Sequence, residues 1–596
     1  MSEYRAPITD MRFTLEHVAG LETLRTLPRF AHVDGDLLTG VFDEAGRFAS
    51  EVIAPLAQVG DTIGSVHNGD GTVATPPGYK EAYQRFVEAG WPAAGFPEEI
   101  GGGGLPWGVA SALQEMIIAA DMGFSLCPML TYGTVDMLSL HGSEEQKATY
   151  LGKLVTSEWS GTMVLTEAQA GSDVGALTTK AVPADDGTWR LTGTKIFITW
   201  GEHDLTENII HIVLARTPGA PPGTKGISCF IVPKYLVNPD GSLGARNDVT
   251  CLSIEHKLGI HSSPTCVLSF GDAGEGAVGY LIGEENEGMR YMFTMMNEAR
   301  LSVGNEGLAV SERAFQQAAS YALERKQGRT VGGERGEQAP IIRHPDVRRM
   351  LMLMRANIAA MRGVLYRNAL AIDLSRHLED EERRTQEEDL AAILTPISKA
   401  WASDLGTELT SLGIQIHGGS GYVEETGAAQ WWRDSRIAAI YEGTNGIQAQ
   451  DLAMRRIPLG GGVAMHRLFE MVLGDAASLE GDLKPIADRL TEATEASAAV
   501  AMTFGQWLLE GRYNDVLAGA TPFLKMMGDT LGGWMLARGA RAATAEPPGY
   551  DPAFLADRIA LAAFYAEHVL PTVIGLKGSC LAGAEGMFAI EESRFG

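Results

Sequence analysis

Apolar and polar residues follow two different periods along the chain. In the first part, apolar residues recur every three or four positions, which predicts amphipathic helices over residues 34–61 and 79–91 and one long buried helix over 106–127. Between the last two, residues 95–108 are dense in glycine and proline and predict a loop. The first 160 residues or so are therefore expected to form a helical region.

The period shortens near Gly161. Runs of β-branched and aromatic residues lie at 188–199, 209–216, 226–233 and 265–270, and turn residues such as NPDG separate them. Short strands at this spacing predict a small antiparallel barrel or sandwich.

Helical periodicity returns at residue 285 and continues to the end. Long apolar-striped segments cover 285–329, 344–373 and 390–419, which predicts a helical bundle. The glycine-rich stretch 330–340 predicts a loop, and the charge run 378–390 is interpreted as a solvated loop or helix end. A Gly- and Pro-containing stretch at 456–467 predicts a hinge. The expected domains are 1–35, 36–160, 161–285, 286–460 and 461–596.

Composition narrows the classes of protein. Hydrophobic residues make up 45% and charged residues 21%, as in a globular protein. The N-terminus lacks the pattern of a signal peptide, and we find no uncharged apolar run long enough to span a bilayer, so a cytoplasmic protein without a membrane span is expected. The net charge of −27 disfavours nucleic acid as a partner. The five scattered cysteines predict reduced, buried thiols and no metal site.

Three clusters could carry chemistry. MVLTEAQAGSD at 163–173 and GIQIHGGSGYVEE at 413–425 combine small and hydroxyl residues, which let backbone N–H groups approach an anion or a ring. Each also has an ordinary explanation, a strand-to-loop turn in the first and a helix ending at glycine in the second. No G-x-G-x-x-G follows a strand and opens a helix, so a nicotinamide site is disfavoured.

The third cluster, AAIYEGTNGIQAQD at 438–451, places Glu442 after an apolar run. A carboxylate in apolar surroundings has a raised pKa, which suits a base that takes a weakly acidic carbon-bound proton. The alternative is that Glu442 caps a helix or pairs with an arginine.

Together, the clusters resemble the signatures of the acyl-CoA dehydrogenase family. Four further stretches match in the right order, namely GFPEEIGGGGL, KIFITWG, HKLGIHSSPTC and YALERKQG. The resemblance covers roughly residues 30–460. It implies a mostly α fold with a central β-barrel domain (helical N-domain, β-barrel, four-helix bundle), to which this chain adds an extra C-terminal helical domain.

The resemblance also implies an FAD cofactor and assigns residues to it. The residues near the flavin would be Met163, Leu165, Thr166, Gly171, Ser172, Phe197, Ile198, Thr199, Thr444 and Asn445. Those holding the diphosphate and adenosine across a subunit interface would be Arg325, Gln327, Gln415, Gly418 and Gly419. Most members have tryptophan at the position of Phe197, and Gly446 stands where the family often has glutamine.

In this family a glutamate takes the α-proton of the thioester while flavin N5 takes the β-hydride, which makes Glu442 the expected base. The expected substrate-binding residues are Ser172, Glu298, Ala299, Arg300, Tyr441 and Gly443. Some members carry the base directly before the arginine, where this chain has Ala299. Glu298 is one residue away, which is about 100° around a helix, so Glu442 keeps the role. The related nitroalkane oxidases use aspartate instead.

The two chain ends indicate a branch of the family. The N-terminal extension and the tail of about 130 residues resemble the branch that contains 3-methylmercaptopropionyl-CoA dehydrogenases and related bacterial enzymes of fatty-acid β-oxidation. This implies a short- to medium-chain acyl-CoA or 3-methylmercaptopropionyl-CoA as substrate, electron-transfer flavoprotein as acceptor, and a homodimer. The alternatives are an acyl-CoA oxidase, a long-chain dehydrogenase, a DNA-binding flavoprotein relative and an inactive homologue.

Overall fold

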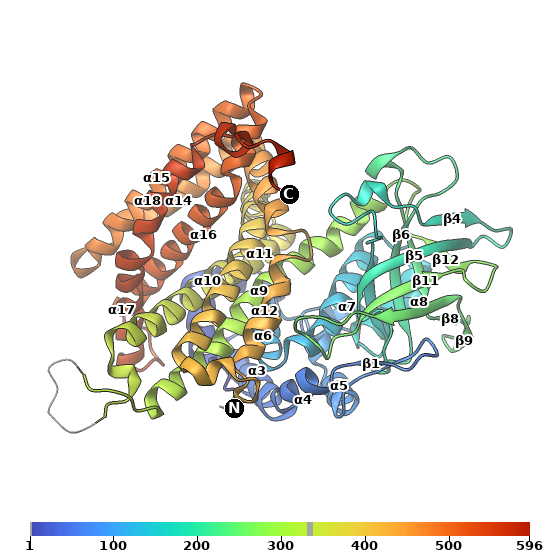
Figure 1. Ribbon diagram of the computed structural model, residues 1–596, viewed down its shortest axis with the longest axis horizontal. Helices are drawn as coiled ribbons and strands as arrows, with labels where there is room; N and C mark the ends of the chain where they lie inside the picture. Colours follow the sequence, from blue (N-terminus) through green and yellow to red (C-terminus); the bar gives the residue numbers. More distant parts are fainter. Residues whose placement is uncertain (1–2, 331–337) are drawn as a thin grey trace. The chain divides into compact units, whose positions relative to one another are not determined.

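The computed structural model describes residues 3–330 and 338–596, which form two compact units. The sheet unit comprises residues 47–105 and 120–302, and the helical unit comprises residues 1–46, 106–119 and 303–596. Most of the loop predicted at 330–340 lies outside the described residues. Figure 1 labels the elements of both units.

The sheet unit combines helical elements with one mixed sheet. Its helical elements are η3 (Ala49–Ile53), η4 (Ala54–Leu56), α4 (Ala57–Ile63), α5 (Tyr79–Glu88), α7 (Met122–His141), α8 (Glu144–Val155) and the first part of α9 (Gly288–Glu324). The predicted helix over 34–61 is thus interrupted, because Pro55 cannot donate the backbone hydrogen bond that a continuous helix requires.

An eight-stranded sheet forms the centre of this unit. Its strands are β3 (Ser160–Val164), β4 (Lys180–Pro183), β5 (Trp189–Thr199), β6 (Ile209–Ala215), β7 (Ser228–Pro233), β10 (Val249–Ile254), β11 (Thr265–Phe270) and β12 (Ala277–Leu281). They run in the order β10-β11-β5-β12-β7-β6-β3, and β4 pairs with β5. Two small ribbons accompany the sheet, β1 (Val66–His67) with β2 (Val73–Ala74) and β8 (Tyr235–Val237) with β9 (Leu243–Arg246).

The sheet curls back on itself. The carbonyl of Thr166, just beyond β3, accepts a hydrogen bond of 2.9 Å from the backbone N–H of Ile196 in β5. All four predicted strand runs are confirmed, whereas the expectation of a purely antiparallel arrangement is wrong in one pair, since β3 and β6 are parallel. The two are separated along the chain by β4 and β5, and this crossover allows a parallel pairing.

The helical unit contains most of the helices. They are α1 (Ile8–Phe13), α2 (Leu21–Arg25), α3 (Gly35–Phe48), α6 (Trp107–Ala120), the rest of α9, α10 (Pro345–His377), α11 (Glu381–His417), α12 (Ala428–Ser435), α13 (Asn445–Asp451), α14 (Val463–Ala477), α15 (Lys484–Leu509), α16 (Tyr513–Thr544), α17 (Pro552–His568) and α18 (Leu570–Cys580). The predicted fold class is confirmed. The charge run at 378–390 continues into the first turns of α11, with Asp380 as its N-cap.

The single helix predicted over 106–127 is wrong. Asp121 separates α6 from α7 because its backbone is extended and its carboxylate accepts a hydrogen bond from the backbone N–H of Phe124. Aspartate is a preferred N-cap for this reason. The apolar pattern continues on both sides of Asp121, so the break carried no signal in the hydrophobic period.

The hinge predicted at 456–467 is a tight turn between the bundle and α14. Gly460, Gly461 and Gly462 have φ values of 59°, 71° and 90°. This left-handed region is readily available to glycine alone. The structure thus has a turn where the hinge was predicted, while the hinge itself and the predicted domain limits stay predictions.

The extensions at the two chain ends pack against each other. The ring of Phe13 lies 5.3 Å from Tyr550 and 5.5 Å from Phe554, in edge-to-face arrangements. The Tyr550 hydroxyl donates to Glu16 at 2.8 Å, and Arg558 pairs with Asp10. The N-terminal extension and the C-terminal helices therefore belong to one packed structure.

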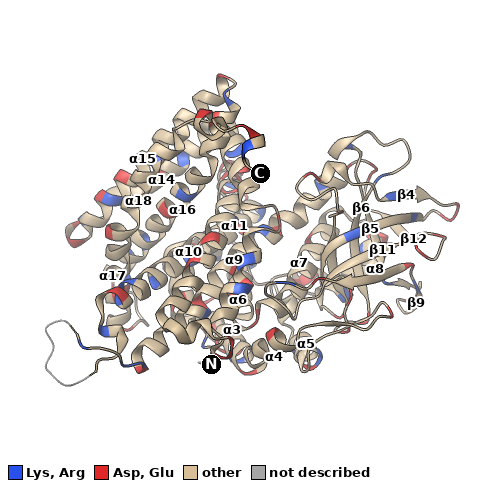
Figure 2. Cartoon of the chain, viewed as in Figure 1, with Lys and Arg blue, Asp and Glu red and all other residues tan. Residues whose placement is uncertain are grey.

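Charged residues of both signs are scattered along the C-terminal helices α14 to α17, as Figure 2 shows. Several are paired within a helix, such as Arg489 with Glu492 at 2.7 Å and Arg512 with Asp515 at 2.8 Å. Acidic residues outnumber basic ones in this part of the chain. This part of the chain therefore carries a net negative charge.

Candidate active site

In the sheet unit, the turn after β3 lies beside the end of β5. The hydrogen bond between Thr166 and Ile196 joins the two segments. The loop that contains Gly171 and Ser172 therefore begins next to the end of the strand that carries Phe197. Both Gly171 and Ser172 are exposed. An added Cβ at Gly171 would meet no atom within 4 Å, which leaves open space next to the backbone.

A buried ion pair holds this turn in place. Lys195 Nζ donates to the carbonyl of Leu165 at 2.8 Å and to Glu167 Oε1 at 2.9 Å, and both side chains are buried. Although burial acts to raise it, the charge of Lys195 and the hydrogen bond from Thr179 hold the pKa of Glu167 well below its usual range. Glu167 is therefore ionised throughout the physiological range and fixes the end of β3. The sequence reasoning did not single out this pair.

Phe197 has the features of a residue held ready for a ligand. Its side chain is 58% exposed and its φ is 59°, and Trp200, three residues later, has a φ of 52°. Bulky residues rarely adopt positive φ, and such strain is concentrated at functional sites. By contrast, the side chain of Ile198 is buried in the core of the sheet, so its predicted contact with the flavin would come from its backbone.

The three predicted substrate residues on α9 face different surroundings. Glu298 accepts from the Ser302 hydroxyl at 2.9 Å, and its other carboxylate oxygen lies near Gly133 on α7. Ala299 is buried. Arg300 donates to Asn297 at 3.2 Å and lies over the ring of Phe293.

In the helical unit, Glu442 lies in a short loop between a 3-10 turn (Arg436–Ala439) and α13. Its φ is 57°, and the side chain is partly exposed. The loop ends at Thr444, which caps α13 by accepting a hydrogen bond from the backbone N–H of Ile447 at 3.3 Å. The predicted base is thus a non-glycine residue held in a left-handed backbone conformation, which its neighbours must stabilise.

Two amide side chains hold this loop, the buried Gln448, which was not predicted, and Asn445, which was. Gln448 donates to the carbonyls of Glu442 and Gly443 at 3.2 and 3.4 Å. Asn445 Nδ2 donates to Asp404 at 2.7 Å and to the carbonyl of Ala400 at 3.1 Å. The Asn445 amide is therefore engaged with α11, and its predicted place beside the flavin would depend on the backbone. Gln448 lies within the cluster at 438–451, but nothing in the pattern indicates its contacts.

Two further ionisable groups flank the loop. The Tyr441 hydroxyl donates to Glu306 Oε2 at 2.5 Å, and Lys399 Nζ donates to Asn445 Oδ1 at 2.8 Å. Burial raises the pKa of Glu306 to about 8; the hydrogen bond from Tyr441 and the charge of Lys399 oppose this shift, and the charge of Glu442 adds to it. Sequence reasoning missed Glu306 because it lies in an apolar stretch of a long helix.

The residues predicted for the FAD diphosphate and adenosine lie at the ends of α9 and α11. The rings of Tyr321 and His417 stack at 4.6 Å and join these two helix ends. The residues concerned are exposed, namely Arg325, Gln327, Gln415, Gly418 and Gly419. Added Cβ atoms at either glycine would meet nothing within 4 Å. The helix ends thus offer open backbone and a cation, as a diphosphate requires.

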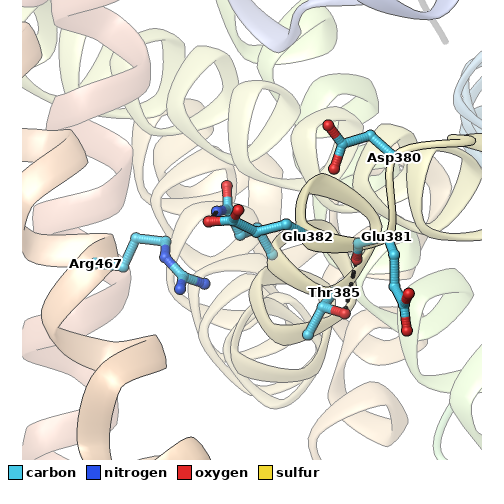
Figure 3. A pocket seen from close by; sticks show the side chains of 6 residues that line it. Asp380, Glu381, Glu382, Thr385 and Arg467 are labelled. Atoms are coloured by element: carbon cyan, nitrogen blue, oxygen red, sulfur yellow. Dashed lines mark hydrogen bonds between the residues drawn. The ribbon is translucent and has the colours of Figure 1, made fainter.

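A separate hollow of 510 Å³ lies at the start of α11. Figure 3 shows the N-cap Asp380, then Glu381, Glu382 and Thr385 on α11, and Arg467 on α14, which line it together with Gln386. None of the predicted site residues lines it. Three acidic side chains against one arginine repel the phosphates of a nucleotide or of coenzyme A, so this hollow is not a candidate for either.

In the described part of the chain, neither the cysteines nor the possible metal ligands form a second reactive site. All five cysteines are free and buried, as predicted. Burial raises the pKa of Cys127 and Cys229 to about 12, so these thiols are unreactive. Within residues 3–330 and 338–596, no group of three His, Cys, Asp or Glu side chains could hold a metal ion.

Four family descriptions match consecutive parts of the chain. They are the acyl-CoA dehydrogenase N-terminal domain at 40–158, the middle domain at 162–273, the C-terminal domain at 286–457, and a region described as acetyl-CoA dehydrogenase C-terminal like at 465–591. The chain belongs to the acyl-CoA dehydrogenase family. The protein is accordingly an oxidoreductase, as the sequence resemblance implied.

Relatives of this family match over nearly the whole chain. The 3-methylmercaptopropionyl-CoA dehydrogenase of Ruegeria pomeroyi is 46% identical and covers 95% of this chain and 96% of its own length. A broad-specificity linear acyl-CoA dehydrogenase of Mycobacterium tuberculosis is 34% identical over 96% of both. The long C-terminal extension is therefore shared with full-length relatives.

Solved structures share the fold over most of the chain. An acyl-CoA dehydrogenase of Bacillus anthracis complexed with FAD has a TM-score of 0.73 at 23% identity, covering 93% of this chain and 90% of its own. The Caenorhabditis elegans protein ACDH-11 in complex with C11-CoA has a TM-score of 0.75 at 21% identity, covering 96% and 93%. Family membership and an FAD-complexed relative agree with the predicted cofactor.

One segment is long and apolar enough to pass a test for membrane spans by length and composition. It is Pro552–Cys580, and 39% of its most apolar window is buried. The helix breaks at Val569, which separates α17 from α18, and α17 contributes Phe554 to the contact with the N-terminal extension. A core helix passes the same test, so this is weak evidence for a span.

Proposed function

We propose that this protein is an FAD-dependent acyl-CoA dehydrogenase that removes the hydrogens from Cα and Cβ of an acyl-CoA thioester, with Glu442 as the base. The observation that carries the proposal is the conformation of Glu442. It is a non-glycine residue at a φ of 57°, in a loop that Gln448, Asn445 and Tyr441 tie to the helical bundle. Strain of this kind is retained where geometry matters for function.

In this proposal, the Glu442 carboxylate takes the α-proton of the thioester. The thioester carbonyl accepts a hydrogen bond from the backbone N–H of Glu442, which stabilises the developing enolate; such a donor contributes about 3–4 kcal/mol. Bound FAD supplies the acceptor for the hydride that leaves Cβ. Phe197 and the loop of Thr166 to Ser172 would hold the flavin, while Arg325 and the open backbone at Gly418 would hold the diphosphate and adenosine of the FAD bound by a partner subunit.

The proposed substrate is a short- to medium-chain acyl-CoA, including 3-methylmercaptopropionyl-CoA. The 46% identity to the Ruegeria pomeroyi enzyme supports this, since it extends over 95% of the chain. We propose electron-transfer flavoprotein as the acceptor, a role in fatty-acid β-oxidation, a cytoplasmic location and a homodimer. An acyl-CoA oxidase or a long-chain dehydrogenase is the alternative, because either would use the same base and cofactor.

The test is anaerobic bleaching of the flavin near 450 nm by acyl-CoAs. The wild type is expected to bleach rapidly, and Glu442→Gln, with FAD retained, is expected to lose about 10²- to 10⁴-fold in rate, as for removal of a general base. Glu298→Gln is the matched control. Glu298 is the glutamate next to Ala299, the position at which some family members carry the base. Bleaching that survives in Glu442→Gln and is lost in Glu298→Gln would move the base to Glu298.

A panel of chain lengths and acceptors completes the experiment. The fastest bleaching is expected with 3-methylmercaptopropionyl-CoA or butyryl-CoA, and reoxidation is expected to need electron-transfer flavoprotein. Fast reoxidation by oxygen with release of peroxide would instead identify an oxidase. If no acyl-CoA bleaches the flavin, the chain is an inactive homologue.

A further inference from the structure

Glu306 is a buried ionisable residue behind the loop that carries Glu442. It lies on α9 in the helical unit and is only 1% exposed. One carboxyl oxygen, Oε2, accepts the hydrogen bond from Tyr441. The other, Oε1, is buried without a hydrogen-bond partner among the residues that the structure describes. A buried carboxyl group with one unsatisfied oxygen is destabilising, so its retention calls for an explanation.

The groups that face Glu306 come from two sides. Tyr441 and Glu442 belong to the loop, and Lys399 belongs to α11. Lys399 is fully buried and donates to Asn445 at the far end of the same loop. Residues 441–445 are thus held at one end by a carboxyl group on α9 and at the other by an ammonium group on α11.

The helices that carry these two groups approach each other closely. An added Cβ on Gly307, next to Glu306, would lie 2.2 Å from the carbonyl oxygen of Ala402 on α11. On Gly304, it would lie 2.5 Å from the carbonyl oxygen of Ser398, next to Lys399. Only glycine permits this approach, and it brings Glu306 and Lys399 to the two ends of one five-residue loop.

We propose that Glu306 is a positioning residue for the reaction, a carboxyl group that stays uncharged and fixes Glu442 by holding the hydroxyl of Tyr441. The inference rests on the proposed function of Glu442. An uncharged partner accepts the tyrosine hydrogen bond without placing a second negative charge beside the base. Ionisation of Glu306 would add that charge and raise the proton affinity of Glu442.

Charge neutrality gives the first test, which does not depend on activity. Because the folded state holds Glu306 protonated, unfolding releases a proton at any pH between the ordinary pKa of glutamate and about 8. The contribution of Glu306 to stability therefore falls as the pH rises through this window and is constant above it. Glu306→Gln has no such group, so its Tm relative to the wild type should rise between about pH 5 and pH 8.

Glu324→Gln is the matched control for the thermal measurement. Glu324 lies on the same helix but is exposed, and its substitution makes the same change of side chain, from glutamate to glutamine. Its Tm relative to the wild type should stay constant over the same range. A constant difference for Glu306→Gln as well would overturn the proposal, because Glu306 would then be ionised in the folded protein.

Single-turnover bleaching by the best acyl-CoA gives the second test. At about pH 6, Glu306→Gln should bleach within about threefold of the wild type, since the amide oxygen accepts the same hydrogen bond. Tyr441→Phe and Glu306→Ala, which lose that bond, should each be about tenfold slower. The bleaching rate of the wild type should depend on pH near pH 8, where Glu306 ionises. The bleaching rate of Glu306→Gln should show no such dependence.

The outcomes separate the two proposals. Loss of bleaching in Glu442→Gln with unaltered rates in Tyr441→Phe and Glu306→Gln at every pH would leave the base assigned and overturn the role of Glu306. Bleaching that persists in Glu442→Gln would overturn the base itself, whatever the thermal measurement gives. If Glu306→Ala fails to fold, Glu306→Gln and Tyr441→Phe still decide the question.

Discussion

Strained residues are found in both groups of predicted site residues. Among the described residues, seven non-glycine positions have positive φ, and they include Phe197, Trp200 and Glu442. Each such residue is destabilised by about 1–3 kcal/mol relative to a relaxed backbone. Phe197 combines a strained backbone with an exposed ring. The combination indicates a residue shaped for a bound ligand.

This strain leads to a prediction for Phe197→Gly. Glycine relieves the backbone strain, so the Tm of the apoprotein should stay constant or rise by a few degrees. Loss of the ring should weaken FAD binding by about tenfold or more, because aromatic contacts contribute about 1 kcal/mol or more beyond buried area. Differential scanning fluorimetry and flavin titration would measure the two effects.

Glu546→Gly is the control for this prediction. Glu546 has a φ of 48° and is exposed in the C-terminal part of the chain. Its substitution should stabilise the protein in the same way and leave the Kd for FAD unchanged. A Phe197→Gly variant with wild-type affinity for FAD would remove Phe197 from the flavin site.

At the scale of elements, the crossing of α9 and α11 determines the site in the helical unit. Gly304 and Gly307 on α9 face Ser398, Ala402 and Gly406 on α11 at distances that no Cβ can occupy. Side chains on both helices can then reach the same loop, as Glu306 and Lys399 do. In the sequence, these glycines look like small residues of an ordinary amphipathic helix, so the pattern does not reveal the close crossing.

Gly307→Ala should therefore destabilise the protein by roughly 2 kcal/mol or more, because the backbone of α11 must move to admit the methyl group. Bleaching by acyl-CoA should slow as well, since the movement displaces Lys399 and Glu306. Chemical denaturation and single-turnover kinetics would measure both.

Gly474→Ala provides the contrasting variant. Gly474 lies in α14, is exposed, and has no atom within 4 Å of an added Cβ. Alanine there should stabilise the helix by about 1 kcal/mol. Equal effects of the two substitutions would show that the crossing is not as close as the structure indicates.

At the scale of the whole molecule, the two extensions form one structure with the bundle. Phe13 packs on Tyr550 and Phe554, and α16 packs on α10 through Gly363 and Met535. Because the C-terminal helices cover bundle surface, that surface is unavailable for pairing with another chain.

We therefore predict a homodimer in solution, in which the second subunit completes the FAD site. Sedimentation equilibrium of the FAD-loaded protein should give twice the mass of the chain. The predicted diphosphate residue Arg325 is exposed in the single chain, as a contact with the cofactor of a partner requires. A mass near four chains would contradict the prediction.

The sequence by itself determined the family, the order of helical and β regions, and the identity of the candidate base. Periodicity located β5, β6, β7 and β11 and the long helices, because burial of one face imposes it on every element. Ordered motifs singled out Glu442 and the loop at 163–173 as candidates, since such motifs are local in the chain. The glycines at 460–462 indicated an interruption between helices, and the structure has a turn with positive φ there.

Other features were decided by the tertiary structure alone. The hydrophobic period continues across Asp121, so only the cap geometry separates α6 from α7. The pairs Lys195–Glu167 and Glu306–Tyr441 join residues 28 and 135 positions apart, and no local pattern encodes which distant side chain a buried charge will meet. The pKa of such a group follows from its burial and its neighbours, and both exist only once the chain has folded.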